Sequence, residues 1–76
     1  MRDLSSIELA IVKCLAQGLQ SKEIAAVVGR RKPTVEGYIR TLYVKLDARS
    51  RAHIVAQAYR VGILGQDLDQ GALAAS

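Results

Sequence analysis

The side chains with the clearest chemical potential in this 76-residue chain are basic, and they gather in its middle. Residues 22–51 hold eight of the eleven lysines and arginines against three of the seven acidic residues. That segment therefore has a net charge of +5 in a chain whose net charge is +4. Lysine and arginine bind phosphate, so this concentration suits a polyphosphate partner. Charge alone is equally compatible with an ordinary solvated surface.

One cysteine and one histidine offer little for catalysis or metal binding. Cys14 lies among Ile11, Val12 and Leu15, which favours a buried packing residue over a reactive thiol. His53 has neither cysteine nor clustered acidic residues beside it, which disfavours a metal site. The chain also lacks paired carboxylates at a plausible cleft, so we expect no enzyme, no cofactor and no metal.

The N-terminal residues do not form a signal peptide, because Asp3, Glu8 and Lys13 interrupt their apolar character. No apolar run approaches the length of a membrane span. Together with an unpaired cysteine, this predicts a soluble, cytoplasmic protein without a membrane partner.

Apolar periodicity and helix-end residues predict an all-α fold. Ser5 and Glu8 give the capping-box pattern S-x-x-E before an amphipathic segment that Gly18 ends. We expect the first helix over residues 6–17.

A short second helix follows. Ser21 is its candidate N-cap, and Ile24, Ala25 and Val28 face inward over about two turns. Gly29 can adopt the left-handed conformation that ends it.

A longer third helix is predicted over residues 32–46. Pro33 is tolerated in its first turn, where a missing N–H breaks no hydrogen bond. Its buried stripe consists of Val35, Ile39, Leu42 and Leu46. The short second helix, the tight basic turn and this third helix together have the layout of a DNA-reading helix-turn-helix.

Asp47 tolerates the turn after the third helix, and Ser50 can cap a fourth helix that ends before Gly62. The four helices predict a bundle-like domain over residues 1–64. Residues 65–76 show no strong periodicity and predict a flexible tail, with a short helix at 66–75 as the alternative.

Several short motifs follow one another along the chain. They are Leu4-Ser5 with Glu8, Leu15-Ala16-Gln17-Gly18-Leu19, Lys22-Glu23-Ile24-Ala25, Gly29, Thr34-Val35, Ile39, Lys45-Leu46 and Arg49-Ser50-Arg51-Ala52. With them, residues 4–64 closely resemble the LuxR-type, or GerE-type, helix-turn-helix domain of bacterial transcription regulators. Jointly these motifs are highly specific, although each alone is weak.

The resemblance implies that the third helix lies in the major groove and that the fourth forms a homodimer on an inverted repeat in double-stranded DNA. It assigns phosphate contacts to Lys22 and Thr34. It assigns base reading to Glu36, Gly37 and Arg40.

The chemistry of these residues agrees in part. Arg40 can pair with guanine O6 and N7. Glu36 can only accept, which favours a cytosine amino group, and its alternative role is an ion pair with Arg40 one turn along the helix.

The basic turn departs from the family pattern. Arg31 replaces the usual capping hydroxyl and Arg30 an apolar residue, and with Lys32 they crowd cations at a positive helix end. We expect DNA phosphate to supply the missing anion. Tyr38 replaces a histidine and either reaches a phosphate or covers the second helix. Lys45 and Arg49 complete the predicted phosphate contacts.

Three readings of the function stay open. The first is a transcription regulator that dimerises through Ala52, Val55, Ala56 and Tyr59 of the fourth helix. The second is a small interaction protein that pairs with another regulator and modulates it without reading DNA. The third is a sigma-like promoter reader that contacts RNA polymerase, against which the Arg49-Ser50-Arg51 segment argues. The sequence fits either a fragment of a larger regulator or a natural one-domain protein.

Overall fold

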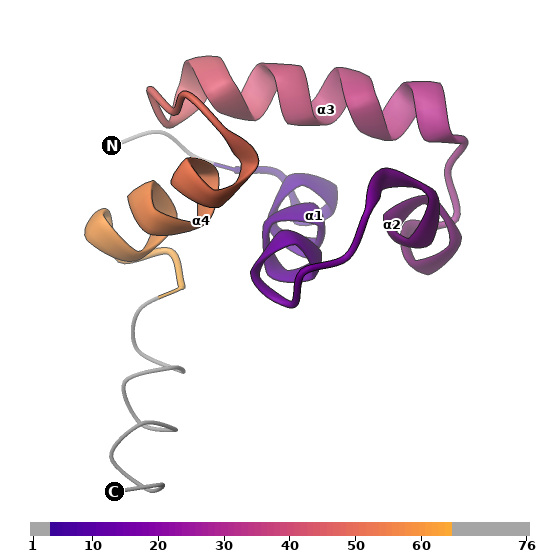
Figure 1. The fold of residues 1–76 in the computed structure, drawn as a ribbon, viewed down its shortest axis with the longest axis horizontal. Helices are drawn as coiled ribbons and strands as arrows, with labels where there is room; N and C mark the ends of the chain where they lie inside the picture. Colours follow the sequence, from indigo (N-terminus) through magenta and orange to yellow (C-terminus); the bar gives the residue numbers. More distant parts are fainter. Residues whose placement is uncertain (1–3, 65–76) are drawn as a thin grey trace, which may run out of the picture.

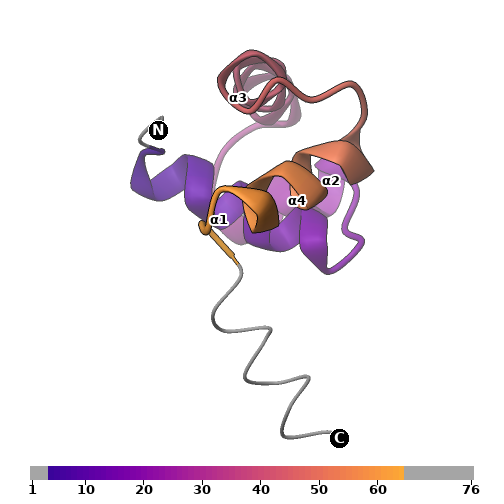
Figure 2. The same cartoon turned by 90° about the vertical axis from the view of Figure 1, so that its left-hand side faces the viewer.

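The computed structural model describes residues 4–64, most of which are helical. The helices are α1 (Ser6–Ala16), α2 (Ser21–Val28), α3 (Lys32–Lys45) and α4 (Arg51–Arg60). No strand occurs in this part of the chain, and the all-α prediction is confirmed. In Figure 1, α3 runs along one side of the molecule, across the layer formed by α1, α2 and α4. Figure 2 views α3 nearly along its axis, on the same side of that layer.

The start of α1 is fixed by its predicted capping box. The Ser5 N–H donates to Glu8 Oε1 at 2.9 Å, and the Glu8 N–H donates to Ser5 Oγ at 3.2 Å. These two bonds satisfy N–H groups that the helix itself leaves without acceptors. The helix ends at Ala16, one residue before the predicted end. Gly18 then takes a φ of +83°, a conformation that favours glycine.

The predicted N-cap of α2 is wrong by one residue. Gln20 occupies the cap position, and its N–H donates to Glu23 Oε1 at 2.8 Å. Ser21 is the first helical residue and is only 3% exposed. Its hydroxyl accepts a hydrogen bond from Arg51 Nη2 of α4. A hydroxyl committed to a neighbouring helix does not cap its own helix, so the cap moves to the preceding residue.

The turn between α2 and α3 follows the sequence expectation. Gly29 is left-handed with a φ of 69°, and α3 begins at Lys32 with Pro33 in its first turn. The third helix ends at Lys45, within one residue of the predicted bound. Asp47 has a φ of +52° and is the one non-glycine residue with positive φ between residues 4 and 64.

One apolar core joins the four helices. All four residues of the predicted α3 stripe are buried in it: Val35, Ile39, Leu42 and Leu46. Ile11 and Val12 of α1, Ile24 of α2 and Ile54 of α4 are its most fully buried partners. Because this stripe faces the layer of the other helices, the opposite side of α3 is left to solvent.

The last helix is capped as predicted, since Ser50 Oγ accepts from the His53 N–H at 3.0 Å. Gln57 Nε2 donates to the Leu46 carbonyl at 2.9 Å and so ties α4 to the end of α3. The predicted tail at 65–76, with its alternative helix at 66–75, lies outside the described residues. Among the helices described, none is long and apolar enough to cross a bilayer.

Candidate nucleic-acid interface

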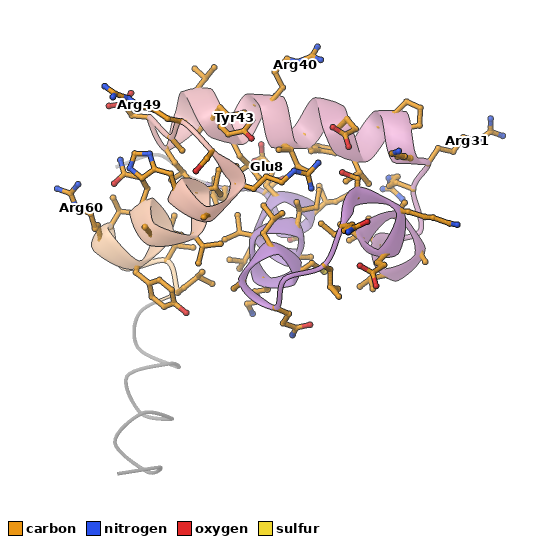
Figure 3. The ribbon with its side chains drawn as sticks, in the orientation of Figure 1. Glu8, Arg31, Arg40, Tyr43, Arg49 and Arg60 are labelled. Atoms are coloured by element: carbon orange, nitrogen blue, oxygen red, sulfur yellow. The ribbon has the colours of Figure 1, made fainter. Side chains whose placement is uncertain are left out.

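The outer face of α3 carries an uncovered stripe of side chains. Thr34, Gly37, Arg40, Thr41 and Val44 are all exposed, and their spacing of three or four positions puts them on one side of the helix. At 1.5 Å per residue the stripe is about 15 Å long. Figure 3 shows Arg40 pointing from it away from the other three helices. A Cβ atom at Gly37 would meet no other atom within 4 Å, so the backbone there is open to approach.

Val44 is a member of this stripe that the sequence analysis missed. Its residue surface is 75% exposed, although valine is apolar. The available signal was its register: Val44 lies three positions after Thr41 and outside the buried stripe that ends at Leu46.

Cationic side chains flank the stripe at both ends of α3. Arg31 is the N-cap residue and makes no side-chain cap hydrogen bond, which confirms that the capping hydroxyl is missing. Its neighbours Arg30 and Lys32 are also exposed. In Figure 3, Arg31 and Arg49 lie near opposite ends of α3, with Arg40 between them. This arrangement, at a helix N-terminus that itself favours anions, suits an extended polyanion.

An open depression of about 590 Å³ lies beside the start of α3. Lys22 from α2, Lys32 and Glu36 from α3, and Arg51 from α4 contribute to its lining. The fold therefore brings Lys22, a predicted phosphate contact, to the same depression as the start of the third helix.

Glu36 is engaged within the protein. Its Oε2 accepts from Arg51 Nη2 at 3.1 Å, and the same nitrogen donates to Ser21 Oγ. Hydrogen bonding to Ser21, followed by the charge and hydrogen bond of Arg51 and the charge of Lys32, holds the pKa of Glu36 below its ordinary value. The alternative that paired Glu36 with Arg40 is wrong, because the carboxylate is turned to Arg51 of another helix. Whether Glu36 also reads bases stays a prediction.

Lys45 is tied to the interior rather than pointing freely outward. Its Nζ lies 2.8 Å from Glu8 Oε1, and the Glu8 side chain is only 5% exposed. Figure 3 labels Glu8 between α1 and α3. Burial, the largest influence on Glu8, raises its pKa. Hydrogen bonds from Lys45 and Ser5 and the Lys45 charge outweigh burial, so the pKa of Glu8 lies below its ordinary value. The phosphate contact of Lys45 stays a prediction.

The tyrosines pack against the core. Tyr43 and Tyr59 are half-buried there. Tyr38 is half-buried against the same core, and its contact with phosphate stays a prediction.

The predicted dimer residues on α4 divide into two pairs. Ala52 and Ala56 are exposed one turn apart, whereas Val55 and Tyr59 are half-buried and packed against the core. A partner helix would therefore meet the two alanines first.

The two residues considered for other chemistry have structural contacts. Cys14 is buried, and burial raises the pKa of its thiol, which confirms the packing interpretation. His53 Nδ1 accepts from the Arg49 N–H at 3.0 Å. Within residues 4–64, no group of three or more His, Cys, Asp or Glu side chains could hold a metal ion.

Comparison with known proteins places this geometry in context. Residues 2–58 match the family described as bacterial regulatory proteins, luxR family. Transcriptional regulatory protein YdfI of Bacillus subtilis is 39% identical over 64 residues, covering 84% of this chain and 30% of the relative. Nitrate/nitrite response regulator protein NarP of Escherichia coli is 46% identical over 48 residues, covering 63% and 22%. HTH-type transcriptional activator RamA of Corynebacterium glutamicum is 38% identical over 61 residues, covering 80% and 22%.

The chain thus spans 22–30% of the length of these three relatives. No solved structure gives a significant match to the chain.

Proposed function

Because the chain belongs to the luxR family of bacterial regulatory proteins, we propose that it binds double-stranded DNA to regulate transcription, with α3 in the major groove. The observation that carries this proposal is the exposed stripe of α3 between Thr34 and Val44, with Arg31 near one end of the helix and Arg49 near the other. An α-helix fits the width of the major groove, where base edges present distinct donors and acceptors. The names of the relatives, a transcriptional regulatory protein and a transcriptional activator among them, fit the same role.

Arg40 and Gly37 are the proposed centre of base reading. Arg40 projects away from the bundle and can donate two hydrogen bonds to guanine O6 and N7. Gly37 lets the helix backbone come close to the base edges beside it. Val44 offers an apolar surface that can contact a thymine methyl group. Glu36 lies at the edge of the stripe, with its carboxylate on Arg51.

Phosphate contacts position the helix in the groove. Thr34 and the exposed cations supply hydrogen-bond donors around both ends of α3, and each neutralised phosphate releases counterions. The proposed contacts are Lys22, Arg30, Arg31, Lys32, Thr34, Tyr38, Lys45 and Arg49.

A homodimer through α4 would present two copies of α3 to an inverted repeat. The exposed alanines at 52 and 56 support this, because small residues let two helices approach closely. Such a dimer would act in the bacterial cytoplasm, on the nucleoid when bound.

The test is a fluorescence-anisotropy titration against genome-selected and random duplexes at two or more salt concentrations. Arg40→Ala should lower affinity for selected sites by about 1–3 kcal/mol and flatten their advantage over random DNA. Lys22→Ala should lower the affinity for all duplexes alike. It should also reduce the slope of log affinity against log salt concentration by about 1, as expected for the loss of one phosphate contact. Binding no stronger than non-specific at low salt would contradict the proposal and favour a protein that modulates another regulator instead.

A further inference from the structure

Arg51 connects three helices at the edge of the proposed DNA-binding face. It is the first residue of α4, and its Nη2 donates to Ser21 Oγ of α2 and to Glu36 Oε2 of α3. Ser21 is almost fully buried, whereas the side chains of Arg51 and Glu36 are 38% and 42% exposed. Arg51 is therefore held at one side by the buried Ser21 hydroxyl. At the other side it reaches the partly exposed carboxylate of Glu36, the residue next to Gly37.

Glu36 is the only acidic residue of α3, so its position matters for a helix that approaches DNA. A carboxylate turned toward the groove would repel phosphates and would accept a hydrogen bond from a cytosine amino group. In the structure this carboxylate is instead directed to Arg51, and Lys32 borders the same depression. Arg51 and Lys32 thus compensate the negative charge of Glu36, at the edge of the exposed stripe that contains Gly37.

We propose that Arg51 is a positioning residue for DNA recognition, which holds Glu36 against α2 and away from base edges and phosphates. Gly37 and Arg40 then set the sequence preference without a contribution from the carboxylate. This inference rests on the proposed DNA-binding function. It assigns Glu36 a different role from the base reading that the sequence resemblance implied.

The effect is expected in DNA binding rather than in folding. A partly exposed arginine–glutamate pair contributes little to stability, because solvent screens it and both side chains lose conformational freedom. The ion pair should matter more for DNA affinity, because loss of Arg51 would leave the negative charge of Glu36 uncompensated next to the DNA. This difference separates a positioning role from a merely structural one.

A double-mutant cycle measures the coupling. Wild type, Glu36→Gln, Arg51→Gln and the double variant are titrated with one selected duplex at two salt concentrations. Arg51→Gln should weaken binding about tenfold when Glu36 is present, and only about twofold in the Glu36→Gln background, where no carboxylate remains to be released.

Arg60→Gln is the matched control. It removes the same charge from the same helix, at its last residue, where Arg60 Nη1 donates to Gln57 Oε1 and not to Glu36. It should weaken binding equally, and slightly, in both backgrounds. Thermal unfolding by circular dichroism checks that each variant is folded. If Arg51→Gln does not fold, Arg51→Lys takes its place in the cycle, because it keeps the charge but has a single ammonium in place of the guanidinium.

Site selection from a randomised duplex pool gives the second readout. Arg51→Gln should acquire a preference for cytosine at one position, and the double variant should lose it again. Equal losses from Arg51→Gln in both backgrounds, or an unchanged selected sequence, would overturn this inference while leaving the proposed function intact. Absence of duplex binding by the wild type would instead overturn the proposed function.

Discussion

Glu8 shows how one side chain serves both a helix end and a tertiary contact. Its carboxylate accepts from the Ser5 N–H at the start of α1 and from Lys45 Nζ at the end of α3. The first contact follows from a pattern of four residues and was predictable. The second joins positions 37 residues apart, which no local pattern encodes. A lysine predicted to contact phosphate therefore has a structural partner.

Replacing Glu8 should destabilise the protein more than replacing the glutamate of an exposed capping box. Glu8→Ala removes the capping acceptor and leaves Lys45 without its buried carboxylate, so we expect a loss of about 2–3 kcal/mol in the free energy of unfolding. Glu23→Ala is the control, because Glu23 accepts from Gln20 in an exposed capping box. It should cost about 0.5 kcal/mol. Urea denaturation measures both, and equal losses would contradict the structural role of Glu8.

The same carboxylate predicts a pH dependence of stability. Its pKa in the folded protein lies below the ordinary value of 4.5, so the unfolded chain takes up the proton first as pH falls. The stabilisation is fully present above 4.5 and is lost as pH falls through the lowered pKa of the folded state. The difference in unfolding free energy between wild type and Glu8→Gln should therefore shrink between neutral and acid pH. A difference that is independent of pH would be inconsistent with this account.

At the scale of the element, α3 begins without a side-chain cap and with three consecutive cations, Arg30, Arg31 and Lys32. Such an end is unfavourable for the free protein, because the helix dipole is positive there. It is favourable once a phosphate is bound. In the proposed complex, the N-terminus of α3 would thus lose stability in the free domain and gain attraction to DNA.

This exchange predicts opposite effects of one substitution. Arg31→Ser should stabilise the free protein by about 1 kcal/mol through a restored cap. It should also weaken DNA binding and reduce the slope of log affinity against log salt concentration by about 1, as expected for the loss of one phosphate contact. Arg31→Ala removes the charge without supplying a cap, so it should weaken binding equally but stabilise the free protein less than Arg31→Ser does, by about 0.3 kcal/mol from the relieved repulsion with the helix dipole. Thermal unfolding and salt-dependent anisotropy on the three proteins would reveal whether the two effects separate.

The helices could be predicted because their ends and faces depend on neighbouring residues. Gly29, Pro33 and Asp47 mark boundaries through backbone conformations that few other residues tolerate. Ser21 was misassigned because its hydroxyl is committed to Arg51, 30 residues away. The ion-pair partner of Glu36 could not be predicted for the same reason. Helical spacing suggested Arg40, whereas the partner in the fold is Arg51 of α4.

At the scale of the whole molecule, the stripe of α3 points away from the other three helices, and the exposed alanines lie on α4, where Ala52 also lines the depression beside the start of α3. We expect a dimer through Ala56 to leave the outer stripe of α3 uncovered in both copies, because that stripe points away from α4. DNA binding and self-association can therefore coexist, and each should be separable by substitution.

Ala56→Asp should weaken the proposed α4 dimer without unfolding the domain. Ala56 is exposed, so a carboxylate is tolerated in the monomer, whereas two facing carboxylates would repel each other across a symmetric interface. Ala26→Asp makes the same change at an exposed position of α2. Sedimentation equilibrium should show a weaker dimer only for Ala56→Asp. The two variants behaving alike would exclude α4 as the contact.

The central claim is that α3 contacts DNA through its outer face. Nuclear magnetic resonance titration of the ¹⁵N-labelled protein with a selected duplex tests it residue by residue. The account predicts that the largest amide shifts fall on Gly37, Arg40, Thr41 and Val44 and on the basic turn before them. Shifts that spare α3 and gather on α1, or no shifts at all under low-salt conditions, would contradict it.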